Sequence, residues 1–199
     1  MLIRRFLYDQ LYPNNLLSSS DVPLRACPSY SGKVRVHSSA VAIFHAPSDQ
    51  SGVYGMHREH IRATKSWRKG PPRYDCVFLN RDPDILGVLG MDIVRVFVFF
   101  SFNFGGKTYP CALVHWFTIV GDEPDEDTGM WIVKPEMDVN GNYVASVIHL
   151  DCIIRSAHLL GVFGGDFIPK GLTCHQSLDS FKAFYVNKYI DHHAFQLAI

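Results

Sequence analysis

The strongest constraint on the fold is a pair of apolar runs that flank Gly105-Gly106. The first run extends from Ile93 to Phe100 and the second from Tyr109 to Val120, and both are rich in β-branched and aromatic residues. Two adjacent glycines between such runs are typical of a tight two-residue hairpin turn, because both can adopt a positive φ. Each arm is too long and too apolar for an exposed ribbon, so at least one face of the hairpin must be buried against another layer.

Weaker patterns predict the elements around this hairpin. Short apolar and alternating runs predict strands over residues 34–44, 74–79, 130–134 and 147–154. Helical spacing predicts a helix over residues 2–12 and another over 175–197, with a helical turn over 56–64. In the last helix Ser177 is the expected N-cap, and the apolar positions are Leu178, Phe181, Phe184, Tyr185 and Ile190. We therefore expect a mainly β (α+β) fold: a small curled antiparallel sheet or barrel around a long hairpin, with N- and C-terminal helices.

The length of 199 residues fits one domain. Residues 1–32 form the expected N-terminal helix and surface connector, residues 33–165 the β-rich core, and residues 175–197 the C-terminal helix. Hydrophobic residues make up 47% and charged residues 19%, a balance that excludes a disordered chain. It also indicates spare apolar surface, which is typical of a protein with a partner or a neighbouring domain.

Charge and cysteine usage narrow the class further. Nineteen basic and nineteen acidic residues give zero net charge, so only a local cluster could favour nucleic-acid binding. Five scattered cysteines do not resemble a disulfide scaffold. The longest uncharged apolar run, Val96 to Phe100, is too short to cross a bilayer. We expect an intracellular protein with free thiols and no membrane partner.

The stretch from His57 to Arg73 is the one local cluster of positive charge, with six cations and one acid. Cations beside an aromatic ring, with Gly and Pro nearby, suit a loop that contacts phosphates. The candidate nucleic-acid-binding residues are Arg58, Arg62, Lys65, Trp67, Arg68, Lys69 and Arg73. The alternative is a solvated loop that pairs with the acidic segment 122–127, which would explain the zero net charge.

Patterns for metal binding or catalysis are weak, and we expect no catalytic residue, no metal and no cofactor. The cysteines form no C-x-x-C pair, and Cys111 and His115 would lie about 13 Å apart on one strand, too far to share an ion. The acidic segment 122–127 lacks the ligand spacing of an EF-hand loop. Asp191-His192-His193 matches a metal-dependent phosphoesterase motif, but a polar helix end is the better interpretation.

The remaining aromatic and nucleophilic residues give no sharper signal. Trp67, Trp116 and Trp131 could build an aromatic cage for a methylated amine, although aromatics at strand positions are more often core. No turn or activating neighbour marks a serine, cysteine or histidine as a nucleophile. The sequence also shows no evident small-molecule site. These patterns favour an interaction module over an enzyme.

Several segments taken together carry a family resemblance. They are residues 5–11, 37–40, 46–49, 55–59, 109–117, 127–131 and 183–193. As a set they resemble the C-terminal region of Plavaka-type (CACTA-like) transposon proteins of basidiomycete fungi. The resemblance implies a detached C-terminal piece or a remnant open reading frame, because the acidic-triad transposase domain of such proteins lies upstream and has no counterpart here. A long hairpin followed by a strand over residues 127–131 and the apolar segment 149–153 is also similar, at the level of fold alone, to bromo-adjacent homology modules.

Three hypotheses follow. The first is a non-catalytic interaction module of a transposon-derived protein that acts in the nucleus on DNA, chromatin or a transposase partner. The second is a structural domain that packs on an upstream transposase domain. The third is a metal-dependent hydrolase that uses Asp191-His192-His193. A positive groove would favour the first hypothesis, and a large exposed apolar patch would favour the second.

Overall fold

The computed structural model describes residues 1–48, 54–165, 167–168 and 170–198. Its strands are β1 (Val34–His37), β2 (Ser39–His45), β3 (Met56–Thr64), β4 (Arg73–Tyr74), β5 (Cys76–Asn80), β6 (Met91–Phe104), β7 (Lys107–Val120), β8 (Ile132–Pro135), β9 (Ala145–His149), β10 (Ile153–Ala157), β11 (Leu159–Val162) and β12 (Ala183–Val186). Its α-helices are α1 (Leu2–Leu11), α2 (Ser177–Ser180) and α3 (His192–Leu197). The expected mainly β class is confirmed.

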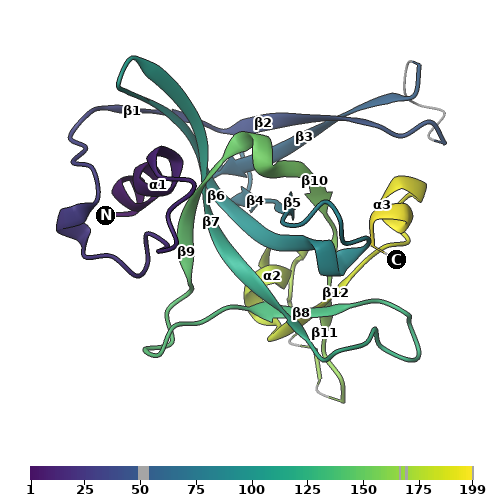
Figure 1. Ribbon diagram of the computed structural model, residues 1–199. Coiled ribbons are helices and arrows are strands. Elements are labelled where there is room, and N and C mark those ends of the chain that lie inside the picture. Colours follow the sequence, from purple (N-terminus) through teal and green to yellow (C-terminus); the bar gives the residue numbers. More distant parts are fainter. Residues whose placement is uncertain (49–53, 166, 169, 199) are drawn as a thin grey trace.

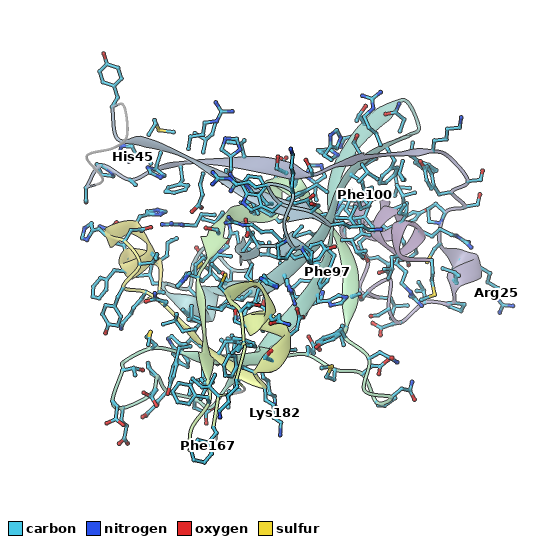
Figure 2. All side chains as sticks on the ribbon, turned by 180° about the vertical axis from the view of Figure 1, so that it is seen from behind. Arg25, His45, Phe97, Phe100, Phe167 and Lys182 are labelled. Atoms are coloured by element: carbon cyan, nitrogen blue, oxygen red, sulfur yellow. The ribbon has the colours of Figure 1, made fainter. Side chains whose placement is uncertain are left out.

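Nine strands form one antiparallel sheet in the order β10-β5-β6-β7-β8-β12-β11, with β1 added beside β6 and β9 beside β7. A second sheet has the order β2-β3-β4, and its β2–β3 ribbon extends beyond the main sheet (Figure 1). Figure 2 shows His45 at the far end of this ribbon, well away from Phe97 in the middle of the molecule.

The β6–β7 hairpin organises the main sheet, as predicted. Phe104 pairs with Lys107, and the two residues between them, Gly105 and Gly106, have φ values of 57° and 78°. These positive values are those of the tight turn that a Gly-Gly pair permits. Each arm has fourteen residues, longer than the predicted runs, and the register shifts between Val96 and Val98.

Both faces of the hairpin are buried. On one face, Phe78, Ile93 and Phe184 pack in a cluster that joins β5, β6 and β12, so the sheet curls around this cluster. On the other face, Val94 and Val114 pack against residues of the β2–β3 ribbon. A third cluster places α1 over the part of the hairpin near its turn. The hairpin therefore lies between layers, which explains its apolar composition.

The curl brings the two edges of the main sheet together without a ladder between them. The edge strands β10 and β11 are separated in sequence by His158 alone. The backbone N–H of Asn187 donates to the carbonyl of His158 at 2.9 Å, beside this junction. No pairing within the described residues joins β10 to β11, so the main sheet is curled rather than a closed barrel.

The predicted C-terminal helix over 175–197 is wrong. A single-turn helix, α2, begins at Ser177, and residues 183–186 then form β12 between β8 and β11. Phe184 and Val186 are both buried, and this alternation is typical of a strand. Helical spacing fits the same segment, and only its pairing with the distant strands β8 and β11 selects the strand. The Asp191-His192-His193 segment consequently lies at the start of a helix, α3, and not at the end of one.

Two other predictions also need correction. Residues 56–64 form β3 rather than a helical turn, because the chain pairs with all seven residues of β2. Residues 147–154 do not form one strand: β9 ends at His149, and β10 begins at Ile153 after one 3-10 turn. The helix over residues 2–12 is confirmed as α1, whereas the loop expected over 47–55 lies partly outside the described residues.

Candidate nucleic-acid interface

The seven candidate residues lie on β3, on β4 and in the loop between them. Arg58 and Arg62 are on β3, Arg73 begins β4, and the loop carries the others, namely Lys65, Trp67, Arg68 and Lys69. Strand alternation turns Arg58 and His60 outward and buries Ile61 and Ala63 against the main sheet. The β3 strand therefore presents cations on the side of the ribbon that is not buried.

Trp67 gathers three guanidinium groups around its ring. The Cζ atoms of Arg62, Arg68 and Arg73 lie 4.1, 5.4 and 5.8 Å from the ring centroid. We call these four residues the Trp67 cluster. Within it only Arg73 has a carboxylate partner, Asp75, whose Oδ1 lies 2.7 Å from the Arg73 Nε. Cation–π attraction thus holds three like charges close together with a single counter-charge.

The loop backbone is strained at the positions of two cations. Arg68 and Lys69 have φ values of 51° and 64°, in the left-handed region that favours glycine. The N–H of Trp67 donates to the carbonyl of Pro71 at 3.0 Å, and the N–H of Gly70 donates to that of Trp67 at 2.8 Å, which closes the turn. Strained residues of this kind are enriched at functional sites.

Several cations of this region have no partner. Within the described part of the chain, the side chains of Arg58, Lys65 and Lys69 make no hydrogen bond or ion pair, and Arg68 contacts only the ring of Trp67. The nearby acids already have partners: Asp75 pairs with Arg73 and accepts from the backbone N–H of Arg62 at 2.9 Å, and Glu59 pairs with Arg155. The region therefore keeps an excess of positive charge.

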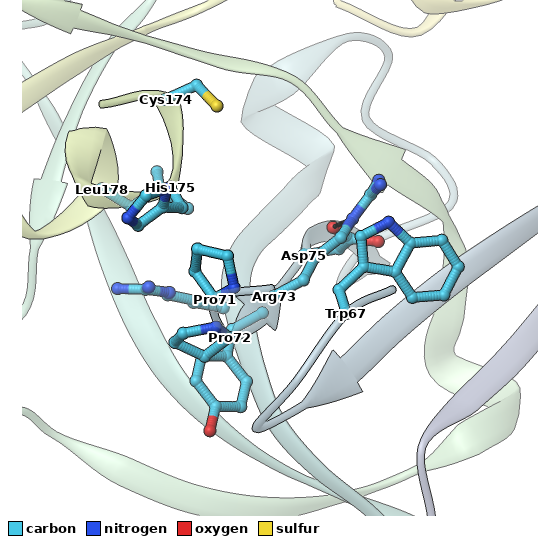
Figure 3. A pocket seen from close by; sticks show the side chains of 10 residues that line it. Trp67, Pro71, Pro72, Arg73, Asp75, Cys174, His175 and Leu178 are labelled. Carbon is cyan, nitrogen blue, oxygen red and sulfur yellow. Dashed lines mark hydrogen bonds and ion pairs between the residues drawn. The ribbon is translucent and has the colours of Figure 1, made fainter. Parts of the chain in front are cut away.

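A groove runs along the open edge of β3. It consists of two adjoining cavities, of about 370 Å³ and 540 Å³, that share Arg73, Tyr74, Asp75 and Leu178. Figure 3 shows the smaller cavity between Trp67 and the prolines on one side and His175 and Leu178 on the other. We call the whole the β3 groove and its smaller part the Trp67 pocket.

Arg155 lines the larger cavity on the side opposite β3. Its guanidinium makes a bidentate pair with Asp191, at 2.8 and 2.7 Å, and lies 3.4 Å from Glu59 Oε1. Glu59 also accepts from the N–H and the hydroxyl of Ser156, at 2.8 and 2.6 Å. The Cζ of Arg155 lies 4.8 Å from the ring centroid of Phe44 on β2. This network ties the β2–β3 ribbon to β10 and to the start of α3.

A second buried arginine borders the Trp67 pocket. Arg95 on β6 forms a bidentate pair with Asp179 of α2, and its Cζ lies 5.2 Å from the ring centroid of Phe97. Its Nε has no hydrogen-bond partner among the described residues, as is also true of Arg155 Nε. This pair attaches the segment with His175 and Leu178 to the sheet and so positions the far wall of the pocket.

The acidic loop after β7 does not neutralise the cations. Asp125 accepts from the N–H and the hydroxyl of Thr128, at 2.9 and 2.7 Å, so this carboxylate organises its own loop. The hydroxyl of Tyr189 donates to the carbonyl of Thr128 at 3.0 Å, which places the loop beside residues 188–189. Between the described residues of 58–73 and 122–127 there is no ion pair, so the expected alternative of internal pairing is not observed for them.

The metal-site candidates are engaged in other contacts. Asp191 caps α3 by accepting from the N–H of Ala194 at 2.7 Å, and the hydrogen bonds from Arg155 hold its pKa below the usual value. The ring of His193 stacks on Phe44 with centroids 4.6 Å apart, and burial, then the charge of Arg155, lower its pKa. His192 faces Gln196 instead. No group of three potential ligands gathers anywhere in the described residues.

The three tryptophans lie apart from one another, and the five cysteines form no disulfide. Trp131 is buried in the core, Trp116 donates to Ser146 Oγ at 2.7 Å, and Trp67 lies in the basic loop, so the three form no cage. All five cysteines are free thiols. Burial raises the pKa of Cys76 and Cys111 to about 12, which keeps both protonated at neutral pH.

Comparisons with known proteins do not assign this chain to a family. No protein-family model matches the chain, and no curated protein or solved structure matches it either. Among the described residues, no helix is long and apolar enough to span a membrane. The case for a function therefore depends on the β3 groove and the residues that line it.

The run of charge in the sequence led us to the residues of one wall of this groove but gave no indication of the opposite wall. The opposite wall comes from Arg155, His175 and Leu178, which lie about a hundred residues further along the chain. Nothing near these residues in sequence marks them as partners of the basic stretch. Only the curl of the sheet, which brings β10 and α2 beside β3 and β4, could have indicated them.

Proposed function

We propose that this chain is a non-catalytic interaction module that binds nucleic acid through the β3 groove. The Trp67 cluster carries the proposal: three guanidinium groups surround one indole ring, and only one of them has a carboxylate partner. Like charges held together with a single counter-charge attract a polyanion and release its counterions on binding. The neighbouring cations Arg58, Lys65 and Lys69, which have no ion-pair partner among the described residues, add to this charge.

The resemblance to Plavaka-type transposon proteins indicates in what kind of protein this binding activity would be used. In such a protein the module would act in the nucleus and hold DNA, chromatin or a transposase partner while catalysis occurs elsewhere. The strongly curled sheet, whose edges β10 and β11 nearly meet, supports a barrel-like module similar to the bromo-adjacent homology fold.

Fluorescence anisotropy with labelled oligonucleotides at low salt tests the proposal. We expect wild-type protein to bind, and the double variant Arg62→Ala/Arg68→Ala to bind at least about tenfold more weakly, since each removes a phosphate contact. A matched control, Arg25→Ala/Lys107→Ala, removes two exposed cations elsewhere and should keep most of the affinity. Absence of wild-type binding at low salt, or equal losses in the two double variants, would refute the proposal.

A second candidate function rests on a different surface. A groove of about 430 Å³ beside α1 is lined almost entirely by apolar side chains, including Val36, Val98 and Leu113. Exposed apolar surface of this kind favours a structural domain that packs on another domain. The dye ANS tests it: wild-type protein should enhance ANS fluorescence, and Val36→Glu should abolish the enhancement. If ANS binds while oligonucleotides do not, the structural role becomes the better account.

A further inference from the structure

The two halves of the β3 groove differ in chemistry. The larger half carries the outward cations of β3, Arg58 and Arg62, which are four residues apart and so about 13 Å apart along the strand. The Trp67 pocket at the other end is bounded by aromatic and apolar surfaces, from Trp67, Tyr74 and Leu178. A charged track thus leads into an aromatic pocket, and both share the residues at their junction, Arg73 among them.

This arrangement distinguishes single strands from duplexes. Proteins that bind single-stranded nucleic acid combine a positive groove that follows the backbone with aromatic side chains that accept bases. In a duplex the bases are stacked inside, and a pocket can take one only after it is flipped out, which is costly. Here the carboxylates in the groove lining pair with Arg155 and Arg73, which leaves the charges of Arg58 and Arg62 without a carboxylate partner among the described residues. The groove ends at an aromatic pocket, and this pocket would remain empty against a duplex.

We propose that the β3 groove takes single-stranded nucleic acid, with phosphates along Arg58 and Arg62 and one unpaired base in the Trp67 pocket. This inference rests on the proposed function and specifies its ligand. At about 370 Å³ the pocket has the size of a small-molecule site, enough for a planar base. Guanidinium planes also stack on bases, and Arg73 and Arg95 both border the pocket.

Two ion pairs hold the walls of the pocket in place before a ligand arrives. The pair between Arg95 and Asp179 holds the segment with His175 and Leu178 at a fixed place. The Arg73 pair with Asp75 holds the junction between the two halves. Tyr74 is supported from behind by Phe97, with ring centroids 5.0 Å apart. A preformed pocket lowers the ordering cost of binding.

The first test compares strand types. Anisotropy titrations would use one labelled oligonucleotide of about ten nucleotides, within the usual site size for such grooves, alone and annealed to its complement. We expect the single strand to bind more than tenfold more tightly. Equal or tighter binding of the duplex would overturn this inference while leaving the proposed function intact. Failure of both forms to bind would instead refute the proposed function.

The second test locates the base. A single 2-aminopurine moved along the oligonucleotide should change its emission sharply at one position and little at the others. Trp67→Leu should weaken single-strand binding between about fivefold and a hundredfold, whereas Trp67→Phe, which keeps a ring, should retain most of the affinity. Thermal unfolding of both variants checks that they fold. Uniform emission at every position of the wild-type complex would contradict a base in the pocket, whatever the variants do.

Discussion

Arg155 and two arginines of the Trp67 cluster, Arg62 and Arg73, line opposite sides of the β3 groove, and their charges are partnered differently. Arg155 is nearly inaccessible, with 4% of its side chain exposed, and two carboxylates and a histidine surround it. In the Trp67 cluster three guanidinium groups share one indole and one carboxylate. The first arrangement satisfies charge inside the fold, whereas the second leaves charge available to a ligand.

The contrast teaches how to separate cations that are paired inside the fold from cations left without a counter-charge in a protein of zero net charge. Counting charges along the sequence treats Arg155 and Arg68 alike. Their surroundings differ because β10 lies beneath the ribbon, where a charge must be paired, and the β3–β4 loop is open to solvent. The following variants are chosen to break or sharpen that distinction, and the largest effect comes first.

Arg155→Ala should lower the free energy of unfolding by about 3–5 kcal/mol, because it leaves the carboxylates of Asp191 and Glu59 without their partner. Urea denaturation measures the change. Arg25→Ala is the matched control: Arg25 projects from the periphery, as Figure 2 shows, and its loss should change stability by less than about 0.5 kcal/mol. Equal, small changes in both variants would show that Arg155 is not structural.

Arg68→Gly/Lys69→Gly should stabilise the fold by about 1 kcal/mol per position and weaken oligonucleotide binding in the same protein. Glycine relieves the positive φ at both residues, while the loss of two cations removes phosphate contacts. Arg68→Ala/Lys69→Ala is the control that removes the charges and keeps the strain, so it should weaken binding without raising stability. A glycine variant that is less stable than wild type would contradict the strained-loop account.

Lowering the pH below about 6.5 should destabilise the protein, through His193 in particular. Its pKa is lowered by burial and by Arg155, while Asp191 and Glu59 oppose the shift and His57 adds to it. The unfolded chain therefore binds a proton that the folded chain resists, and stability falls as pH falls, by less than about 1.4 kcal/mol per pH unit for one such group. His193→Gln should flatten the dependence measured by urea denaturation at pH 7.5, 6.0 and 5.0.

His115 has a pKa lowered in the same direction, by burial and by Arg95, so a residual slope is expected in that variant. An unchanged slope would show that His193 does not contribute. A steeper decline of stability should follow at more acidic pH, because the pKa of Asp191 is also held below its usual value by Arg155 and protonation would break that pair.

The sequence-based predictions were most accurate for elements that depend on residues close together in the chain. The Gly105-Gly106 turn and α1 were found because turn residues and helical spacing act over a few positions. The strand over Ala183–Val186 was missed, since Phe181, Phe184 and Tyr185 fit a helix equally well until β8 and β11 offer partners. Residues 56–64 were misassigned for the same reason, because charged residues hid the alternation of Ile61 and Ala63.

For the candidate site, too, the sequence revealed the features that are local in the chain and not those that depend on distant residues. The basic stretch was visible as a run of charge, and its seven residues remain predictions for binding. The separation from the acidic loop was not predictable, because it depends on where β7 ends and on the contact of Thr128 with Tyr189. The strained backbone at Arg68 and Lys69 also has no sequence signal, since neither arginine nor lysine is typical of positions with a positive φ.

The most direct test of the central claim is the salt dependence of single-strand affinity. Each phosphate contact contributes about 0.7 to the slope of log K against log salt, so Arg58→Ala/Arg62→Ala should reduce that slope by about 1.4. A control that removes two exposed cations elsewhere, Arg25→Ala/Lys107→Ala, should leave the slope nearly unchanged. Slopes that fall equally in the two variants would contradict a dedicated cationic site.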